Sequence, residues 1–81
     1  MIINKAATAG SDANNFETGT GYRLNGGIDV AHKPSNMNRM VIYTYADDSI
    51  PYATKFQIAL IADGSIAARE YDGSWSDWST P

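Results

Sequence analysis

The stretch that decides the fold is Lys55 to Trp78, KFQIALIADGSIAAREYDGSWSDW, which contains two Asp-Gly pairs, Asp63-Gly64 and Asp72-Gly73. Each pair lies between segments that can form strands. Asp-Gly is a strong hairpin signal, because a type I′ turn requires positive φ at both of its central residues. This stretch therefore predicts a three-strand antiparallel meander.

Two-residue loops at these pairs would also set the register. Ile61 would lie opposite Ile66, and Glu70 opposite Trp75. Directly opposed side chains share a face of a sheet. One predicted face, expected to be the core, carries Phe56, Ile58, Leu60, Ala67, Tyr71 and Trp78, interrupted by Arg69, Ser74 and Ser76. The other, mixed face carries Gln57, Ala59, Ile61, Ile66, Ala68, Glu70, Trp75 and Asp77.

A helical interpretation competes with the meander. Gln57 to Ala62 and Ile66 to Glu70 are rich in Ala, Leu, Glu and Arg. Each piece is shorter than the roughly 10 to 12 residues of an ordinary helix, so the strands are favoured.

Composition narrows the class of protein. The chain has 81 residues, no cysteine and a net charge of −3. Its six basic residues are scattered, which argues against nucleic acid as a partner. No apolar run has the roughly 18 residues of a membrane span, and no signal-peptide core is visible. Oligomerisation is a usual way to stabilise a domain this small without disulfides.

The first half of the chain has few strong signals. We predict one domain, with residues 1–16 as an N-terminal loop or docking segment and residues 17–81 as the β module. Met1 to Ile3 can form a short strand, and Ser11 or Asp12 can cap a helical turn. Phe16 is the expected apolar anchor. Short strands are expected at Tyr22–Leu24 and Ile28–Ala31.

The best single strand is Arg39 to Ala46. Its β-branched and aromatic side chains favour a sheet. Apolar residues point to both sides of it, which indicates a central strand or a subunit contact. A loop is expected at 47–54. The fold class is therefore all-β: a small, mostly antiparallel sheet or sandwich of five to six short strands, with a loop-rich N-terminal segment.

The order of several short motifs resembles the pyocin-knob type of domain from tail fibres of bacteriophages and phage-tail-like bacteriocins. The motifs are Asp12–Asn15, Thr18–Tyr22, Lys33–Asn36, Val41–Tyr45, Gln57, Ala68–Tyr71 and Trp75–Trp78. The chain departs from that pattern at Ala13-Asn14, where Leu-Asn is more usual, and at Lys33-Pro34, where Asn-Pro is more usual.

This resemblance implies a non-enzymatic module near the receptor-binding end of a trimeric fibre. Its partners would be two further copies of itself, the rest of the fibre and a bacterial surface polysaccharide. It would be located in the virion, extracellular when functional and made in the bacterial cytoplasm. No cofactor is expected. The first alternative is a structural spacer, trimerisation or virion decoration module, and the second is a small glycan-active enzyme.

The ligand-binding residues expected for a saccharide are Trp75, Glu70, Asp77, Tyr43 and Tyr45, since aromatic rings stack on sugars and carboxylates bind hydroxyls. Residues three apart in a regular strand point to opposite faces, so Trp78 is expected in the core and Trp75 outside it. The expected structural residues are Trp78, Arg69, Gln57, Tyr22, Asp63, Gly64, Asp72 and Gly73. Arg69 is expected to anchor the meander to the N-terminal loops, with Asp12 as the candidate partner.

Other chemistry has weaker signals. His32 is the only histidine. It is expected to be a solvated loop residue, and metal ligation would need carboxylates or another chain. Asp47-Asp48-Ser49 lacks the ligand spacing of an EF-hand loop and is expected to be a solvated turn. No nucleophile elbow, phosphate-binding loop or paired-histidine motif is present, and no metal site is predicted.

Overall fold

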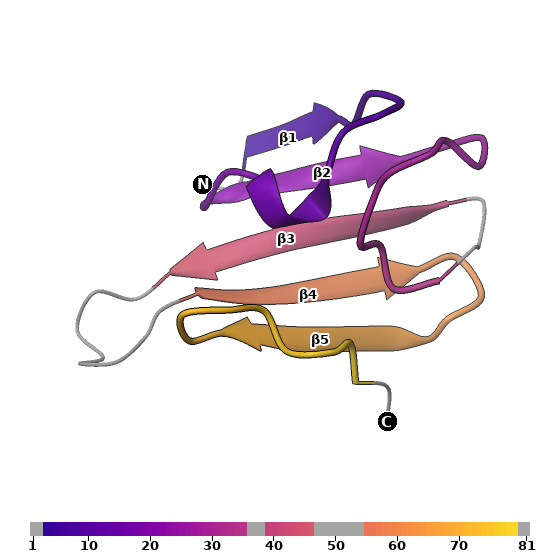
Figure 1. Cartoon of the computed structure of the whole chain (residues 1–81). Helices are drawn as coiled ribbons and strands as arrows, with labels where there is room; N and C mark the ends of the chain where they lie inside the picture. Colours follow the sequence, from indigo (N-terminus) through magenta and orange to yellow (C-terminus); the bar gives the residue numbers. More distant parts are fainter. Residues whose placement is uncertain (1–2, 36–38, 47–54, 80–81) are drawn as a thin grey trace.

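In the computed structural model, which describes residues 3–35, 39–46 and 55–79, the chain forms one five-stranded mixed sheet (Figure 1). The strands follow one another across the sheet in chain order. The first pair is parallel and the other three pairs are antiparallel. The strands are β1 (Ile3–Ala6), β2 (Thr20–Leu24), β3 (Met40–Ala46), β4 (Lys55–Ile61) and β5 (Ile66–Tyr71). The predicted all-β, mostly antiparallel class is confirmed.

The parallel pair requires a connection that returns across the sheet from the end of β1 to the start of β2. This connection contains a single 3-10 turn, η1 (Ala13–Asn15). Asp12 caps the turn, because its carboxylate accepts a hydrogen bond from the Asn14 N–H at 2.9 Å. Phe16, buried as expected, stacks on the Tyr22 ring with centroids 4.0 Å apart. The predicted capped turn and its apolar anchor are therefore confirmed.

One face of the sheet, which we call the covered face, lies under η1, the loop of residues 25–35 and residues 72–79, which we call the tail (Figure 1). Its strand residues include Thr20, Tyr22, Leu24, Met40, Ile42, Thr44, Gln57, Ala59, Ile61, Ala67, Arg69 and Tyr71. With Ala13, Phe16 and Val30 from the covering segments, the apolar members form the core.

The opposite face, which we call the open face, has no described segment over it. Its strand residues are Arg23, Val41, Tyr43, Tyr45, Phe56, Ile58, Leu60, Ile66, Ala68 and Glu70. Five large residues are well exposed: Leu60 55%, Tyr45 47%, Ile66 42%, Ile58 41% and Phe56 37%. The expectation that β3 is central, with apolar residues on both sides, is confirmed.

The predicted register of the first hairpin is wrong by one residue. The Ile61 N–H donates to the Ser65 carbonyl at 3.0 Å, so the loop has three residues, Ala62 to Gly64. Gly64 has φ +93°, whereas Asp63 does not have the positive φ that a type I′ turn requires. A three-residue loop with glycine in the left-handed position is the next commonest hairpin connection.

A one-residue shift moves every side chain of a strand to the other face. Leu60 therefore pairs with Ile66, and Gln57 pairs with Arg69. Phe56, Ile58 and Leu60, expected in the core, lie on the open face, while Gln57, Ala59 and Ile61 are buried. The assignment of Ala67 to the core is confirmed.

The third strand of the predicted meander is irregular. The tail runs beside β5 through only two isolated bridges, Tyr71 with Trp75 and Ala68 with Ser79. The predicted pair of Glu70 with Trp75 does not form, because Trp75 lies opposite Tyr71. Between the two bridges, β5 advances by three residues, from Ala68 to Tyr71, while the tail advances by four, from Trp75 to Ser79. The tail therefore has one extra residue, as in a β-bulge. This extra residue lets two side chains three positions apart point to the same face.

The remaining expectations concern the loops. Ile28–Ala31 is not a strand, although Ala31 forms an isolated bridge with Asp12. Residues 3–6 belong to the sheet and are therefore more than a loop segment. The interpretation of Asp47-Asp48-Ser49 and of the loop at 47–54 lies outside the described residues.

Candidate functional site

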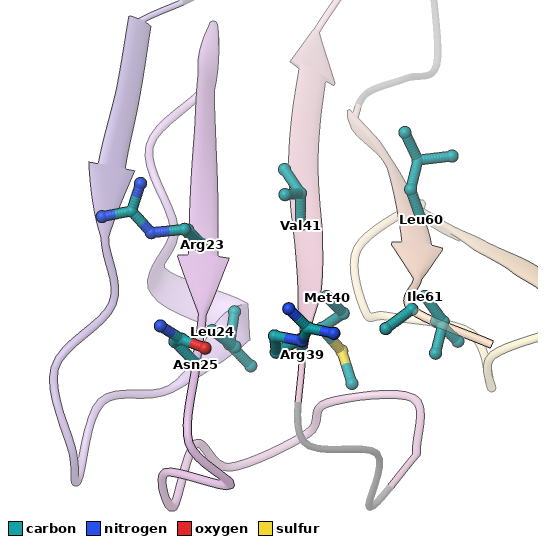
Figure 2. Close-up of a pocket in the computed structure, with 9 residues that line it drawn as sticks. Arg23, Leu24, Asn25, Arg39, Met40, Val41, Leu60 and Ile61 are labelled. Carbon is teal, nitrogen blue, oxygen red and sulfur yellow. The ribbon is translucent and has the colours of Figure 1, made fainter. Parts of the chain in front are cut away.

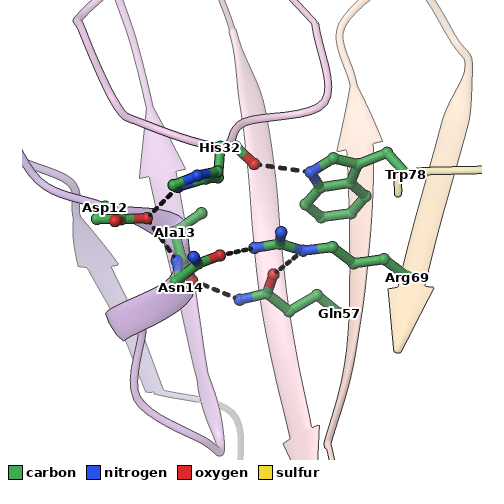
Figure 3. A network of polar contacts seen from close by, with 7 residues as sticks. All are labelled: Asp12, Ala13, Asn14, His32, Gln57, Arg69 and Trp78. Carbon is green, nitrogen blue, oxygen red and sulfur yellow. Dashed lines mark hydrogen bonds and ion pairs between the residues drawn. The ribbon is translucent and has the colours of Figure 1, made fainter. Parts of the chain in front are cut away.

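The centre of the covered face holds a buried polar network built on Gln57 and Arg69 (Figure 3). The Gln57 amide donates to the Ala13 carbonyl at 2.8 Å and to the Thr44 hydroxyl at 3.0 Å. The Arg69 Nε donates to Gln57 Oε1 at 2.7 Å. Its Nη2 donates to Asn14 Oδ1 at 2.9 Å. Among the described residues, no buried side-chain nitrogen or oxygen lacks a partner.

Arg69 therefore connects the sheet to the N-terminal loop, as predicted, but through Asn14 rather than directly through Asp12. Burial of the guanidinium lowers the pKa of Arg69 to about 10, and the nearby Asp12 carboxylate opposes that change. Arg69 remains a cation at neutral pH. Its Nε and Nη2 both donate to acceptors within the chain, so the network links the sheet to the η1 turn.

A second link ties the tail to the loop of residues 25–35 (Figure 3). The Trp78 indole N–H donates to the His32 carbonyl at 2.7 Å. The His32 ring nitrogen Nδ1 lies 2.8 Å from Asp12 Oδ1. The hydrogen bond from the Asn14 N–H, together with His32, holds the pKa of Asp12 below its ordinary value. His32 therefore joins the tail to the N-terminal turn, through its carbonyl on one side and its ring on the other, and is not simply the solvated residue expected. Its backbone has a positive φ of 64°.

Both indoles contact Arg69, which corrects the prediction that Trp75 and Trp78 lie on opposite faces. The guanidinium carbon is 4.3 Å from the centre of the Trp75 ring and 4.6 Å from that of the Trp78 ring. Trp75 also meets the edge of Tyr71, with centroids 5.3 Å apart. The bulged tail explains this arrangement, and Trp75 is a packing partner of a buried cation.

The other four expected ligand-binding residues come together on the open face. Tyr43, Tyr45, Glu70 and Asp77 line one shallow depression of about 390 Å³. Phe56, Ile58 and Ala68 contribute its apolar floor, and Ser76 and Ser79 of the tail form part of its rim. We call this the acidic depression. Its aromatic rings, carboxylates and hydroxyls are groups that can bind a saccharide.

A second depression, of about 400 Å³, lies at the opposite corner of the sheet (Figure 2). Arg23, Arg39, Val41 and Leu60 line it together with Asn25 and Ala62. The Arg23 side chain extends toward β1, and Arg39 lies at the start of β3, near the end of β2 (Figure 2). We call this the basic depression. The sequence contains no signal for this depression, because Arg23 and Arg39 are 16 positions apart and reach the same corner only through the pairing of β2 with β3.

The described residues contain no group of three or more His, Asp or Glu side chains able to hold a metal ion. Within the same residues, no helix is long and apolar enough to cross a membrane.

Comparison of the chain with protein-family models, with curated proteins and with solved structures found no match. The resemblance to pyocin-knob domains therefore stays a prediction from the sequence motifs.

Proposed function

We propose that this chain is a non-enzymatic assembly module of a phage-type tail fibre, in which other copies cover its open face. The sequence resemblance is what suggests a fibre, a location in the virion and an assembly of three copies. One observation carries the assembly: five large apolar side chains are exposed together on one sheet face.

The physical reason is the cost of leaving such a face in water. Burying one Leu, Ile or Phe side chain completely is worth about 1.5 to 3 kcal/mol. Contiguous exposed apolar patches on a soluble chain commonly mark interaction sites. This chain has no disulfide to compensate for its small size, so covering the face stabilises the fold as well as the assembly.

Multi-angle light scattering with size exclusion tests the proposal. The unmodified chain should elute as an oligomer, and Ile58→Lys should convert it to a folded monomer, because a charge on the open face cannot be buried unpaired. Thr18→Lys, at an exposed position away from that face, is the matched control and should leave the oligomer intact. A monomeric unmodified chain would refute the proposal.

Attachment to a bacterial surface polysaccharide is the second candidate function, and the composition of the acidic depression favours it. Three equivalent weak sites on one fibre would reinforce one another by avidity. A saccharide array with Tyr45→Ala and Asp77→Asn tests this candidate: both variants should lose signal. Trp75→Ala, on the covered face, reports general damage. Equal binding by Tyr45→Ala, Asp77→Asn and the unmodified chain would exclude the site.

A further inference from the structure

The open face has its charges at two opposite corners. Arg23 and Arg39 stand at the β2–β3 corner, and Glu70 and Asp77 stand at the β5 corner. Among the described residues, none of these four side chains forms an ion pair; the two pairs found there are Lys5 with Glu17 and His32 with Asp12. Between the corners the face is apolar.

The corners lie on a diagonal of the sheet. Arg23, Val41, Leu60 and Ile66 occupy one row across the four strands, and Glu70 is four residues further along β5. With strands about 4.8 Å apart and about 3.3 Å per residue, the corners are roughly 14 Å apart across the sheet and roughly 13 Å apart along it.

We propose that a second copy of this chain docks on the open face, with its basic depression against the acidic depression of the first copy. This inference rests on the assembly function proposed above and specifies its contact. The charge pattern favours another copy over a foreign partner, because the face is complementary to itself. Each copy presents two cations and two anions that form no ion pair within the described residues, at matching separations.

A two-fold axis between the faces, perpendicular to the diagonal, satisfies both corners at once. Because the diagonal runs at roughly 45° to the strands, the strands of the two copies then cross near 90°, which is one of the two preferred ways of packing sheets. Used head to tail, the same corner contact joins each copy to the next in a closed ring, as a trimer requires.

The area of the face sets the strength of the contact. Four strands of about 20 Å present a face of roughly 300 to 400 Å² in projection, which is small beside the ~800 Å² that each partner contributes to a standard interface. Association should therefore be reversible and depend on concentration and salt, because unshielded rim charges contribute through Coulomb attraction.

Charge reversal followed by sedimentation velocity tests the contact. The basic-corner variant is Arg23→Glu with Arg39→Glu, and the acidic-corner variant is Glu70→Lys with Asp77→Lys. Each places like charges opposite one another, so self-association should weaken at least tenfold between about 5 and 500 µM. A chain with all four substitutions restores opposite charges and should associate like the unmodified chain.

The control is Glu17→Lys with Asp29→Lys, which changes the net charge as much as the acidic-corner variant does but lies off the open face. It should not weaken association. Circular dichroism confirms that each variant is folded.

The outcomes separate the two proposals. An oligomer that neither reversal weakens, or that the fourfold variant fails to restore, overturns the corner contact and leaves the assembly function standing. An unmodified chain that stays a monomer at about 500 µM overturns both. A folded monomer whose Glu70 and Asp77 instead bind a saccharide would assign the acidic depression to that ligand.

Discussion

Each face of the sheet departs from the usual distribution of side chains: the covered face buries polar groups within its apolar core, and the open face exposes large apolar residues. The covered face buries Thr44, Gln57 and Arg69, whereas the open face leaves Ile58 and Leu60 in contact with solvent. The buried polar groups have fixed partners, which are one another and the groups of the η1 turn above them. The apolar residues opposite have no cover among the described segments. The covered face therefore holds the fold of one chain together, and the open face is where we propose that other copies bind.

The largest effect is expected from Arg69→Met on the covered face. The change removes the donors to Gln57 and Asn14 and the cation between two indoles. Because buried acceptors are left without donors, the free energy of unfolding should fall by about 3 to 5 kcal/mol. Urea unfolding followed by tryptophan fluorescence measures it. A loss below about 1 kcal/mol would mean that the network does not hold the fold.

A matched pair of isoleucines compares the faces directly. Ile42→Ala, at a fully buried position, should cost about 2 to 5 kcal/mol through loss of packing and the cavity left behind. Ile58→Ala, measured at low concentration where the chain is monomeric, should cost less than about 1 kcal/mol. Thermal or urea unfolding of both variants gives the two values. Equal losses would contradict the assignment of faces.

Much of the fold could be predicted from the sequence because its strongest signals are local. The strand at Met40–Ala46, the capped turn at Ala13–Asn15 and the anchor Phe16 all follow from residues close together in the chain. The faces of β4 could not be predicted, because a single residue in the loop length reverses them. Asp-Gly is compatible with loops of two or three residues, and Gly64 alone adopts positive φ here.

The residues of the acidic depression could be predicted only in part, again because the path of the chain around one loop decides which side chains share a face. Glu70 and Asp77, with Tyr43 and Tyr45, do line one depression. Trp75 does not belong to it, because the extra residue in the tail turns its ring toward Arg69. A bulge at that position has no signature in Ser-Trp-Ser-Asp-Trp.

A smaller effect is expected at the first turn, which sets the faces. Gly64→Ala should destabilise the chain by about 1 kcal/mol, because alanine is strained at φ +93° even though its methyl group would have open space. Ala62→Ser, in the same loop, should change the free energy of unfolding by no more than about 0.5 kcal/mol. Urea unfolding compares the two. If Gly64→Ala proves neutral, the three-residue turn is incorrect.

The smallest effect on stability is expected from the contact between Asp12 and His32. The hydrogen bond from the Asn14 N–H and the contact with His32 lower the pKa of Asp12 from its ordinary value of 3.8. Its contribution to stability is therefore present above that value and is lost as the pH falls through the lowered folded pKa. Asp12→Asn should flatten the acid side of the stability–pH curve, while Asp29→Asn should not. Identical curves for the unmodified chain and Asp12→Asn would rule out this role.

Hydroxyl-radical footprinting at low and high protein concentration tests most directly whether copies of the chain cover the open face. At high concentration Tyr45, Phe56 and Leu60 should become protected, while the exposed residues of the N-terminal turn keep their labelling. Labelling of those three side chains that does not change with concentration would contradict the account.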